Sequence, residues 1–342
     1  MSAANLNVSK YRSRSSTQSL IGFSISFESG PLLARGFGLE HLRDLLVRFA
    51  RPLLRSGADL AYAGDWKERD DNFTYELLRL ISAEQEDNSL AGPDTDLTIG
   101  RLRNHLAWPH YLAVTPRVEA QWIQCCRIIR ITQEIAGIDP ASIASDDEPR
   151  GTERYRLNSA IALSQLRRLA VSGMVVSVNG TPETYTVPGL TARIVLGGKT
   201  KDFSGFVPGI FEEALVMLEN KRPLYILGGF GGAAEILART LLGQDPQELD
   251  VSWQEGATPH LKTLRSLSDS RPLPSGVRPT GESLRALRER LQLARPTLST
   301  SLNTGLEEAE TKELLTTRDM RRAVQLVFKG LAQSAGFVLL RT

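Results

Sequence analysis

The sequence is poor in several features that would place a chain of 342 residues in a known class of protein. Its two cysteines, Cys125 and Cys126, are adjacent, which excludes a disulfide framework and the spaced thiolates of a zinc site. Its four histidines are scattered without metal-ligand spacing, and neither a nucleophile elbow nor a Ser-His-Asp arrangement is visible. The sequence therefore predicts no metal and no cofactor.

Long hydrophobic runs and a charge excess are also missing. No stretch of roughly 18 apolar residues is present, so the sequence predicts no membrane span. Lysine and arginine total 41 against 39 acidic residues, and the net charge of +2 disfavours a nucleic-acid or anionic-membrane partner. The polar residues 1–19 lack the apolar core of a signal peptide; they predict a disordered tail and a cytoplasmic protein.

What is present is an alternation of strand and helix patterns. The predicted strands are 20–27, 58–63, a segment within 101–114, 193–196 and 223–227. The predicted helices are 39–55, 73–84, 117–136, 152–171, 208–220 and a helix that ends near Gly243. This order predicts an α/β protein with a Rossmann-like, doubly wound, mostly parallel sheet.

Three parts of the chain are predicted. Residues 1–19 form the tail, and residues 20–243 form the Rossmann-like domain, with a hairpin inserted at about 172–190 around Asn179-Gly180. Residues 244–342 form a loop-rich and helical C-terminal extension packed on the same domain. Within it, 258–280 predicts a surface excursion, 282–293 and 307–333 predict helices, and 337–340 predicts a short strand.

The most informative stretch follows the strand at 223–227. Gly228, Gly229, Phe230, Gly231 and Gly232 form a glycine-rich turn, and a helix begins directly after them. Free N–H groups and the positive end of the helix dipole converge on such a turn, which favours phosphate binding. The alternative is a tight strand-to-helix turn that binds no ligand.

Glycine-bearing turns follow three further strands. In a parallel sheet they lie along the same edge, where ligands bind at the topological switch point. No Walker A loop and no dinucleotide-binding fingerprint is present. The candidate ligand-binding residues in these three turns are Ser26, Ser29, Gly30, Gly64, Asp65, Gly197, Gly198 and Lys199.

The stretch Gly228-Gly229-Phe230-Gly231-Gly232-Ala233-Ala234-Glu235 resembles the G-G-x-G-T-x-x-E signature of the LOG, or lysine-decarboxylase-like, phosphoribohydrolases. These belong to the SLOG superfamily with DprA and the N-terminal domains of TRPM channels. With residues 21–26, Gly64-Asp65 and 193–199, the resemblance covers roughly residues 20–243 and is closest to the prokaryotic nucleotide-sensor branch. It implies a sheet that binds a nucleotide or an ADP-ribose-like molecule. Gly232 and Leu227 replace the family's threonine and proline, which counts against a hydrolase more than against a binding protein.

Several single residues have two interpretations. In a hydrolase, Glu235 would act on the ribose with a nearby arginine, Arg167 or Arg168. Otherwise it binds a ligand by a hydrogen bond to its ribose, or is a carboxylate in the first turn of a helix. Lys199 meets a phosphate or is a solvated turn residue. Asp65 binds a ribose hydroxyl or caps the following segment, and Glu212 contacts a ligand or favours a helix start.

The preferred hypothesis is a cytoplasmic sensor of a nucleotide-derived ligand, ADP-ribose-like or a cyclic nucleotide second messenger, in bacterial signalling or anti-phage defence. The resemblance implies a homo-oligomer and a separate effector protein as partners. The main alternative is a LOG-like N-glycosidase that cleaves nucleoside monophosphates. A DprA-like binder of single-stranded DNA is disfavoured because no aromatic and basic stripe is present.

Overall fold

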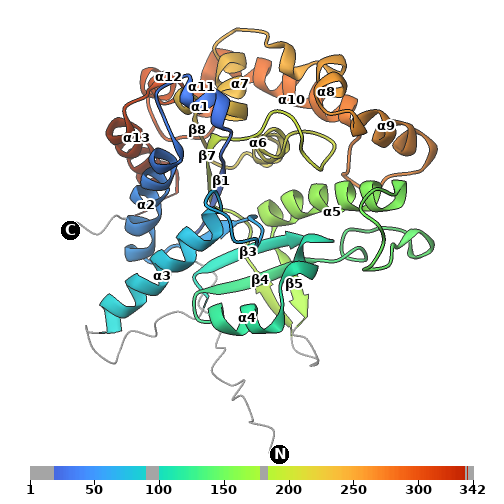
Figure 1. Cartoon of the computed structure of the whole chain (residues 1–342). Helices are drawn as coiled ribbons and strands as arrows, with labels where there is room; N and C mark the ends of the chain where they lie inside the picture. Colours follow the sequence, from blue (N-terminus) through green and yellow to red (C-terminus); the bar gives the residue numbers. More distant parts are fainter. Residues whose placement is uncertain (1–18, 90–99, 178–183, 336, 338–342) are drawn as a thin grey trace, which may run out of the picture.

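Six parallel strands form the central sheet of the protein. The computed structural model describes residues 19–89, 100–177, 184–335 and 337, and the rest is drawn in grey (Figure 1). The strands of this sheet are β1 (Leu20–Ser26), β2 (Asp59–Tyr62), β3 (Leu102–Ala107), β4 (Cys126–Ile131), β7 (Ala192–Gly197) and β8 (Leu224–Leu227). Their order is β4-β3-β2-β1-β7-β8, and every pair is parallel.

This order confirms the predicted doubly wound α/β fold. From β1 the chain first builds outward through β2, β3 and β4, and then crosses over to build β7 and β8 on the other side. The topological switch point therefore lies between the C-terminal ends of β1 and β7. A separate antiparallel hairpin pairs β5 (Met174–Ser177) with β6 (Thr184–Val187), and its predicted turn at Asn179-Gly180 lies outside the described residues.

Helices cover both faces of the sheet. The helices up to the glycine-rich turn are α1 (Ser29–Leu33), α2 (Leu39–Arg55), α3 (Phe73–Ser89), α4 (Pro116–Trp122), α5 (Glu153–Ser172) and α6 (Gly209–Glu219). Those after it are α7 (Gly232–Leu241), α8 (Val251–Ala257), α9 (His260–Ser270), α10 (Thr280–Ala294), α11 (Leu298–Ser301), α12 (Glu308–Thr316) and α13 (Met320–Ser334). Figure 1 shows α2 and α3 on one side of the sheet and α5 and α6 on the other.

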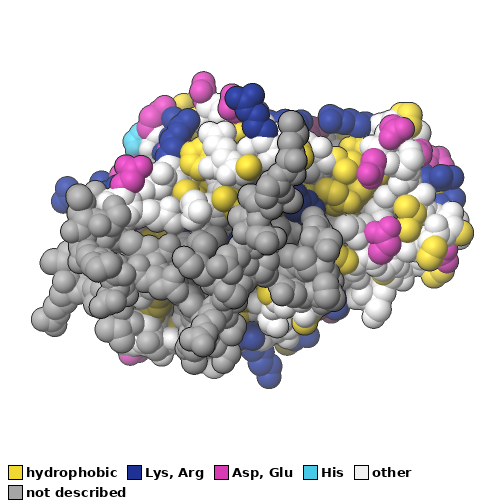
Figure 2. All heavy atoms as spheres, turned by 90° about the horizontal axis from the view of Figure 1, so that it is seen from below, with side chains coloured by type: hydrophobic (Ala, Val, Ile, Leu, Met, Phe, Trp, Pro, Cys, Tyr) yellow, Lys and Arg dark blue, Asp and Glu magenta, His cyan; other side chains and the backbone are white. Residues whose placement is uncertain are grey.

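The face of the molecule that lies at the bottom of Figure 1 is drawn in Figure 2, and it carries charges of both signs. On the described part of this face, basic and acidic side chains are interspersed (Figure 2). Such mixing is typical of a surface in contact with water. None of the described helices is long and apolar enough to cross a membrane.

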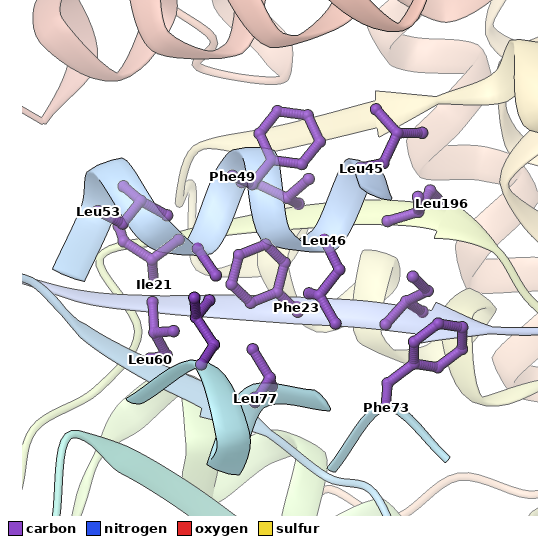
Figure 3. Close-up of a cluster of buried hydrophobic side chains, with 14 of the residues drawn as sticks. Ile21, Phe23, Leu45, Leu46, Phe49, Leu53, Leu60, Phe73, Leu77 and Leu196 are labelled. Carbon is purple, nitrogen blue, oxygen red and sulfur yellow. The ribbon is translucent and has the colours of Figure 1, made fainter. Parts of the chain in front are cut away.

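One face of the sheet is largely apolar and packs against α2, α3 and α13. Ile21 and Phe23 of β1 point to this face, toward Leu46 and Phe49 of α2 (Figure 3). All four side chains are at most 2% exposed. Alternation along the strand sends every second residue here, which explains the predicted strand at 20–27.

The opposite face is divided. One apolar cluster gathers around β7, β8, α6, α7 and α10, and a second around β3, β4, α5 and α9. Between them the strands place polar residues on this face: Ser24 of β1, His105 of β3 and Arg193 of β7, each less than 5% exposed. We call these three residues, together with the side chains of α5 and α6 that face them, the polar seam. The polar seam separates the two apolar clusters.

The C-terminal region packs against β8 and both layers of helices. The backbone N–H of Leu224 donates to the carbonyl of Leu302, at 2.9 Å, so the outer edge of β8 is covered. The Tyr225 hydroxyl donates to the carbonyl of Thr304 and lies 2.8 Å from the Ser334 hydroxyl. Helix α10 contacts α6 and α7, while α13 contacts α2.

Two predicted elements are wrong. The helix predicted over 117–136 is the short α4, which Thr115 caps, followed by strand β4. The isoleucines at 128, 129 and 131 are β-branched and fit a strand, and pairing with β3 outweighs the helical spacing. The excursion predicted over 258–280 contains α9, because Leu261, Leu264 and Leu267 bury one face against α5.

Candidate functional site

Two of the predicted turns meet at the switch point. Ser26 at the end of β1 is paired with Gly197 at the end of β7, and the Gly198 N–H donates to the Ser26 carbonyl at 3.0 Å. Gly197 and Gly198 have φ angles of +64° and +96°, which only glycine adopts without strain. The glycines therefore let the chain turn sharply beside β1.

The start of α7 is the third turn at this place. The Ala233 N–H donates to the Gly198 carbonyl at 2.9 Å, and Gly232 has a φ of +64°. A β-carbon on Gly232 would lie 2.4 Å from the carbonyl oxygen of Gly198. The turns after β1, β7 and β8 are thus in direct backbone contact, as their shared sheet edge predicts.

The first part of the glycine-rich stretch faces the protein's own chain. A β-carbon on Gly228 would lie 2.4 Å from the Leu315 carbonyl oxygen, and one on Gly229 would lie 2.0 Å from that of Thr317. Phe230 is fully buried, with its ring centroid 5.0 Å from that of Phe37. The last turn of α12 and the apolar core account for these three residues, so their predicted contact with a ligand stays a prediction.

Glu235 is paired with an arginine that the sequence did not single out. Its carboxylate forms an ion pair with Arg35, in the segment after α1, and the two side chains are 26% and 18% exposed. The pair lies on the first turn of α7, next to the turns just described. Arg35 has no motif around it and lies 200 residues away in the sequence.

Arg167 and Glu212 are paired with each other. The ion pair joins α5 to the first turn of α6, and both side chains are at most 10% exposed. A β-carbon on Gly209 would lie 3.0 Å from the guanidinium group, so glycine makes room for it. Arg168 instead donates to the Gly276 carbonyl at 3.1 Å. The structure thus places Arg35, and neither predicted arginine, against Glu235.

Asp65 organises its own loop. Its carboxylate accepts hydrogen bonds from the Lys67 N–H and the Asn72 amide and forms an ion pair with Arg69 at 3.1 Å. A β-carbon on Gly64 would overlap the side chains of Tyr62 and Thr74. These contacts match the capping interpretation of Asp65 and give Gly64 a packing role.

The accessible candidates surround the switch point. Ser29, Gly30 and Lys199 are exposed, and nothing lies within 4 Å of where a β-carbon on Gly30 would be. One oxygen of the Glu28 carboxylate is buried and has no hydrogen-bond partner among the residues that the structure describes. The Ser29 hydroxyl and the flexible Lys199 ammonium group therefore lie at exposed positions beside the buried turns.

Solvent also reaches the sheet surface here. Ala63 directly follows β2, in the middle of the sheet, yet it is exposed. Because Tyr62 is paired with Phe23 and with Asn104, Ala63 lies between Ser24 and His105, on the face that carries the polar seam. The seam is thus open at the C-terminal edge of β2.

Arg193 organises the seam. Its Nη1 donates to the Ser24 hydroxyl at 2.7 Å and lies 2.9 Å from the Glu213 carboxylate of α6. Arg193, Ser24 and His105 are not among the site residues that the sequence predicts. The available signal was a polar side chain inside each buried strand, where an apolar residue is the rule.

His110 begins a short helix, His110–Ala113, that follows β3. Burial lowers its pKa, and the charges of Asp65, Lys67, Arg150 and Arg167 also act on it. In the described ranges, no group of three or more His, Cys, Asp or Glu side chains is arranged to hold a metal.

Acidification is expected to destabilise the protein through His105. Burial, reinforced by the charge of Arg193, lowers the pKa of His105 from 6.5 to about 4. Between these values the unfolded chain binds a proton that the folded protein excludes, so stability falls as the pH drops from 6.5 to 4. The difference between the two pKa values of His105 corresponds to about 3 kcal/mol in the free energy of unfolding. Urea unfolding at pH 7 and pH 4 measures it.

The variants His105→Gln and His41→Gln provide the comparison. The His105→Gln variant should lose most of the fall in stability between pH 7 and pH 4 that His105 causes. The His41→Gln variant should keep it. If the native protein and His105→Gln lost the same stability between pH 7 and pH 4, the loss could not be assigned to His105.

A search of curated proteins finds no match to this chain. A family model described as SLOG cluster2 matches residues 15–314, a range that contains the whole six-stranded sheet and its switch point. The chain therefore belongs to the SLOG cluster2 family.

Proposed function

We propose that this protein is a sensor that binds a nucleotide-derived ligand, ADP-ribose-like or a cyclic nucleotide second messenger, at the switch point between β1 and β7. Its SLOG membership supports a nucleotide-related function. The setting is bacterial signalling or anti-phage defence. Ligand binding shifts the association of the protein with itself or with an effector protein, as linkage requires when two states bind differently.

The observation that carries this proposal is the set of exposed residues around the switch point. Exposed Ser29, Gly30 and Lys199 surround the turns after β1 and β7, and exposed Ala63 opens the sheet surface beside them. In doubly wound sheets, ligands bind at this crevice. Lys199 and the nearby Arg35 supply positive charge for the phosphates, and backbone N–H groups of the turns supply donors.

A ligand screen by thermal unfolding tests the proposal. The probes are ADP-ribose, cyclic di-AMP, cyclic di-GMP and nucleoside monophosphates. A ligand at 100 times its dissociation constant should stabilise the folded protein by about 2.7 kcal/mol. Lys199→Ala should weaken binding about tenfold because a charge-assisted hydrogen bond is lost.

The matched control is Lys262→Ala, which removes an exposed lysine of α9. It should leave both stability and affinity unchanged. No stabilisation by any probe, or equal weakening by the two lysine variants, would contradict the proposal.

The alternative function is an N-glycosidase. The ion pair of Glu235 with Arg35 fits it, because such an enzyme needs an acidic residue and an arginine. A sensor leaves its ligand intact, so no free base should appear when the protein is incubated with nucleoside monophosphates. Release of base that Glu235→Gln abolishes would favour the enzyme instead.

A further inference from the structure

Glu28 carries a carboxylate that the described part of the chain leaves unpaired. Its Oε2 atom is buried and accepts no hydrogen bond there, and none of the described cationic side chains forms an ion pair with it. The residue as a whole is only half-buried, so a ligand can reach the carboxylate. Native proteins rarely leave a partly buried polar group without a partner, because its lost hydration is then not compensated. The carboxylate therefore has room for a hydrogen-bond donor from outside the chain.

The backbone places this side chain at the switch point. Glu28 lies two residues beyond Ser26, whose carbonyl accepts from the Gly198 N–H. Phe27 packs with Phe23 in the apolar cluster on one face of the sheet, and the backbone of Glu28 is extended, with φ −129° and ψ 108°. Successive residues of an extended chain point to opposite sides. The side chain of Glu28 therefore lies on the other face, which carries the first turns of α6 and α7.

The groups around Glu28 define which part of a ligand it can meet. The segment that begins at Glu28 ends at Arg35, which is paired with Glu235 on the first turn of α7, and Lys199 follows the turn after β7. In the proposed function these cations and the backbone N–H groups bind phosphate. An ionised carboxylate only accepts hydrogen bonds, and it repels phosphate. Glu28 therefore requires a donor close to a phosphate, and in a nucleotide the sugar hydroxyls are the nearest donors.

We infer that Glu28 recognises a ribose of the ligand by accepting a hydrogen bond from its 2′-hydroxyl and, where that group is free, from its 3′-hydroxyl. The two oxygens of a carboxylate match two neighbouring hydroxyls, and carboxylates bind ribose hydroxyls in other doubly wound folds. This inference rests on the proposed function and narrows its ligand: the protein selects a ribonucleotide over the corresponding deoxyribonucleotide.

Matched ribose and deoxyribose probes test the inference by calorimetry on the full chain. Of ADP-ribose, cyclic di-AMP, cyclic di-GMP and AMP, the probe that binds most tightly is compared with its analogue that lacks the 2′-hydroxyls. The analogue should bind about tenfold more weakly, because it leaves the carboxylate without a donor. A difference below about threefold would overturn the inference and leave the proposed function standing. Absence of binding by all four ribose probes would overturn both.

Glu28→Gln assigns the preference to this side chain. Glutamine has nearly the same shape but no charge, so the ribose probe should bind about fivefold more weakly or worse, whereas the deoxy analogue should bind no more weakly than before. If Glu28 only lay near the phosphates, loss of its negative charge would strengthen the binding of both probes. Unchanged or tighter binding of both would therefore overturn the inference.

Two further variants complete this experiment. Glu28→Asp withdraws the carboxylate by one methylene group and should also weaken the ribose probe more than the deoxy analogue. Glu289→Gln, which removes an exposed carboxylate of α10, should leave both affinities unchanged. Thermal unfolding without ligand shows that each variant is folded, and Glu28→Gln should be no less stable than the native protein, because it removes an unpaired charge. A folded Glu28→Asp protein with the native preference would overturn the inference as well.

Discussion

Replacing Arg167 by alanine is expected to lower the free energy of unfolding by about 3 to 5 kcal/mol. The substitution leaves the Glu212 carboxylate buried at the start of α6 without its partner, and the cost of an uncompensated buried charge exceeds that of the lost contact. The midpoint of urea unfolding at pH 7 measures the effect.

Two further variants make the Arg167 result specific. Arg154→Ala, at an exposed position of the same helix, should change stability by no more than about 0.5 kcal/mol. The double replacement Arg167→Leu with Glu212→Leu should recover most of the loss, because no unpaired charge remains. A loss below about 1 kcal/mol in Arg167→Ala would contradict the buried pair.

Gly232→Thr, which restores the residue of the LOG signature, is expected to destabilise the protein by about 2 to 5 kcal/mol. Its φ of +64° disfavours any β-branched residue, and the new β-carbon would lie 2.4 Å from the Gly198 carbonyl oxygen. Thermal unfolding measures the loss.

Gly256→Thr is the matched control for this substitution. It places the same side chain in α8 at an exposed position with open space around it, where the stability change should be small. A Gly232→Thr protein as stable as the native one would mean that the turn rearranges. In that case the departure from the signature has no structural basis at this position.

The sequence predicted the sheet because strand and helix patterns alternate, and a parallel α/β arrangement is the packing that such alternation favours. It failed at β4, where a short isoleucine-rich run fits both a helix and a strand. Only pairing with β3 decides between them. It also missed α9, because the surrounding prolines and serines obscured three leucines at helical spacing.

The candidate site, like the fold, was predictable only in part. Glycines after successive strands marked the turns, since the parallel arrangement brings them to one edge. The partners of single side chains were not predictable: Glu235 meets Arg35, and Arg167 meets Glu212, through contacts between distant segments. The seam around His105 and Arg193 depends on which strands are neighbours, and the sequence does not state that order.

The contact of α12 with Gly228 and Gly229 has a mechanical consequence. No side chain lies between the main chain of these glycines and that of residues 315–317, so neither surface can yield by changing a rotamer. The same turn continues into α7, whose first residues touch Gly197 and Gly198. Any molecule that pushes on the beginning of α7 therefore pushes, through rigid backbone, on the C-terminal end of α12.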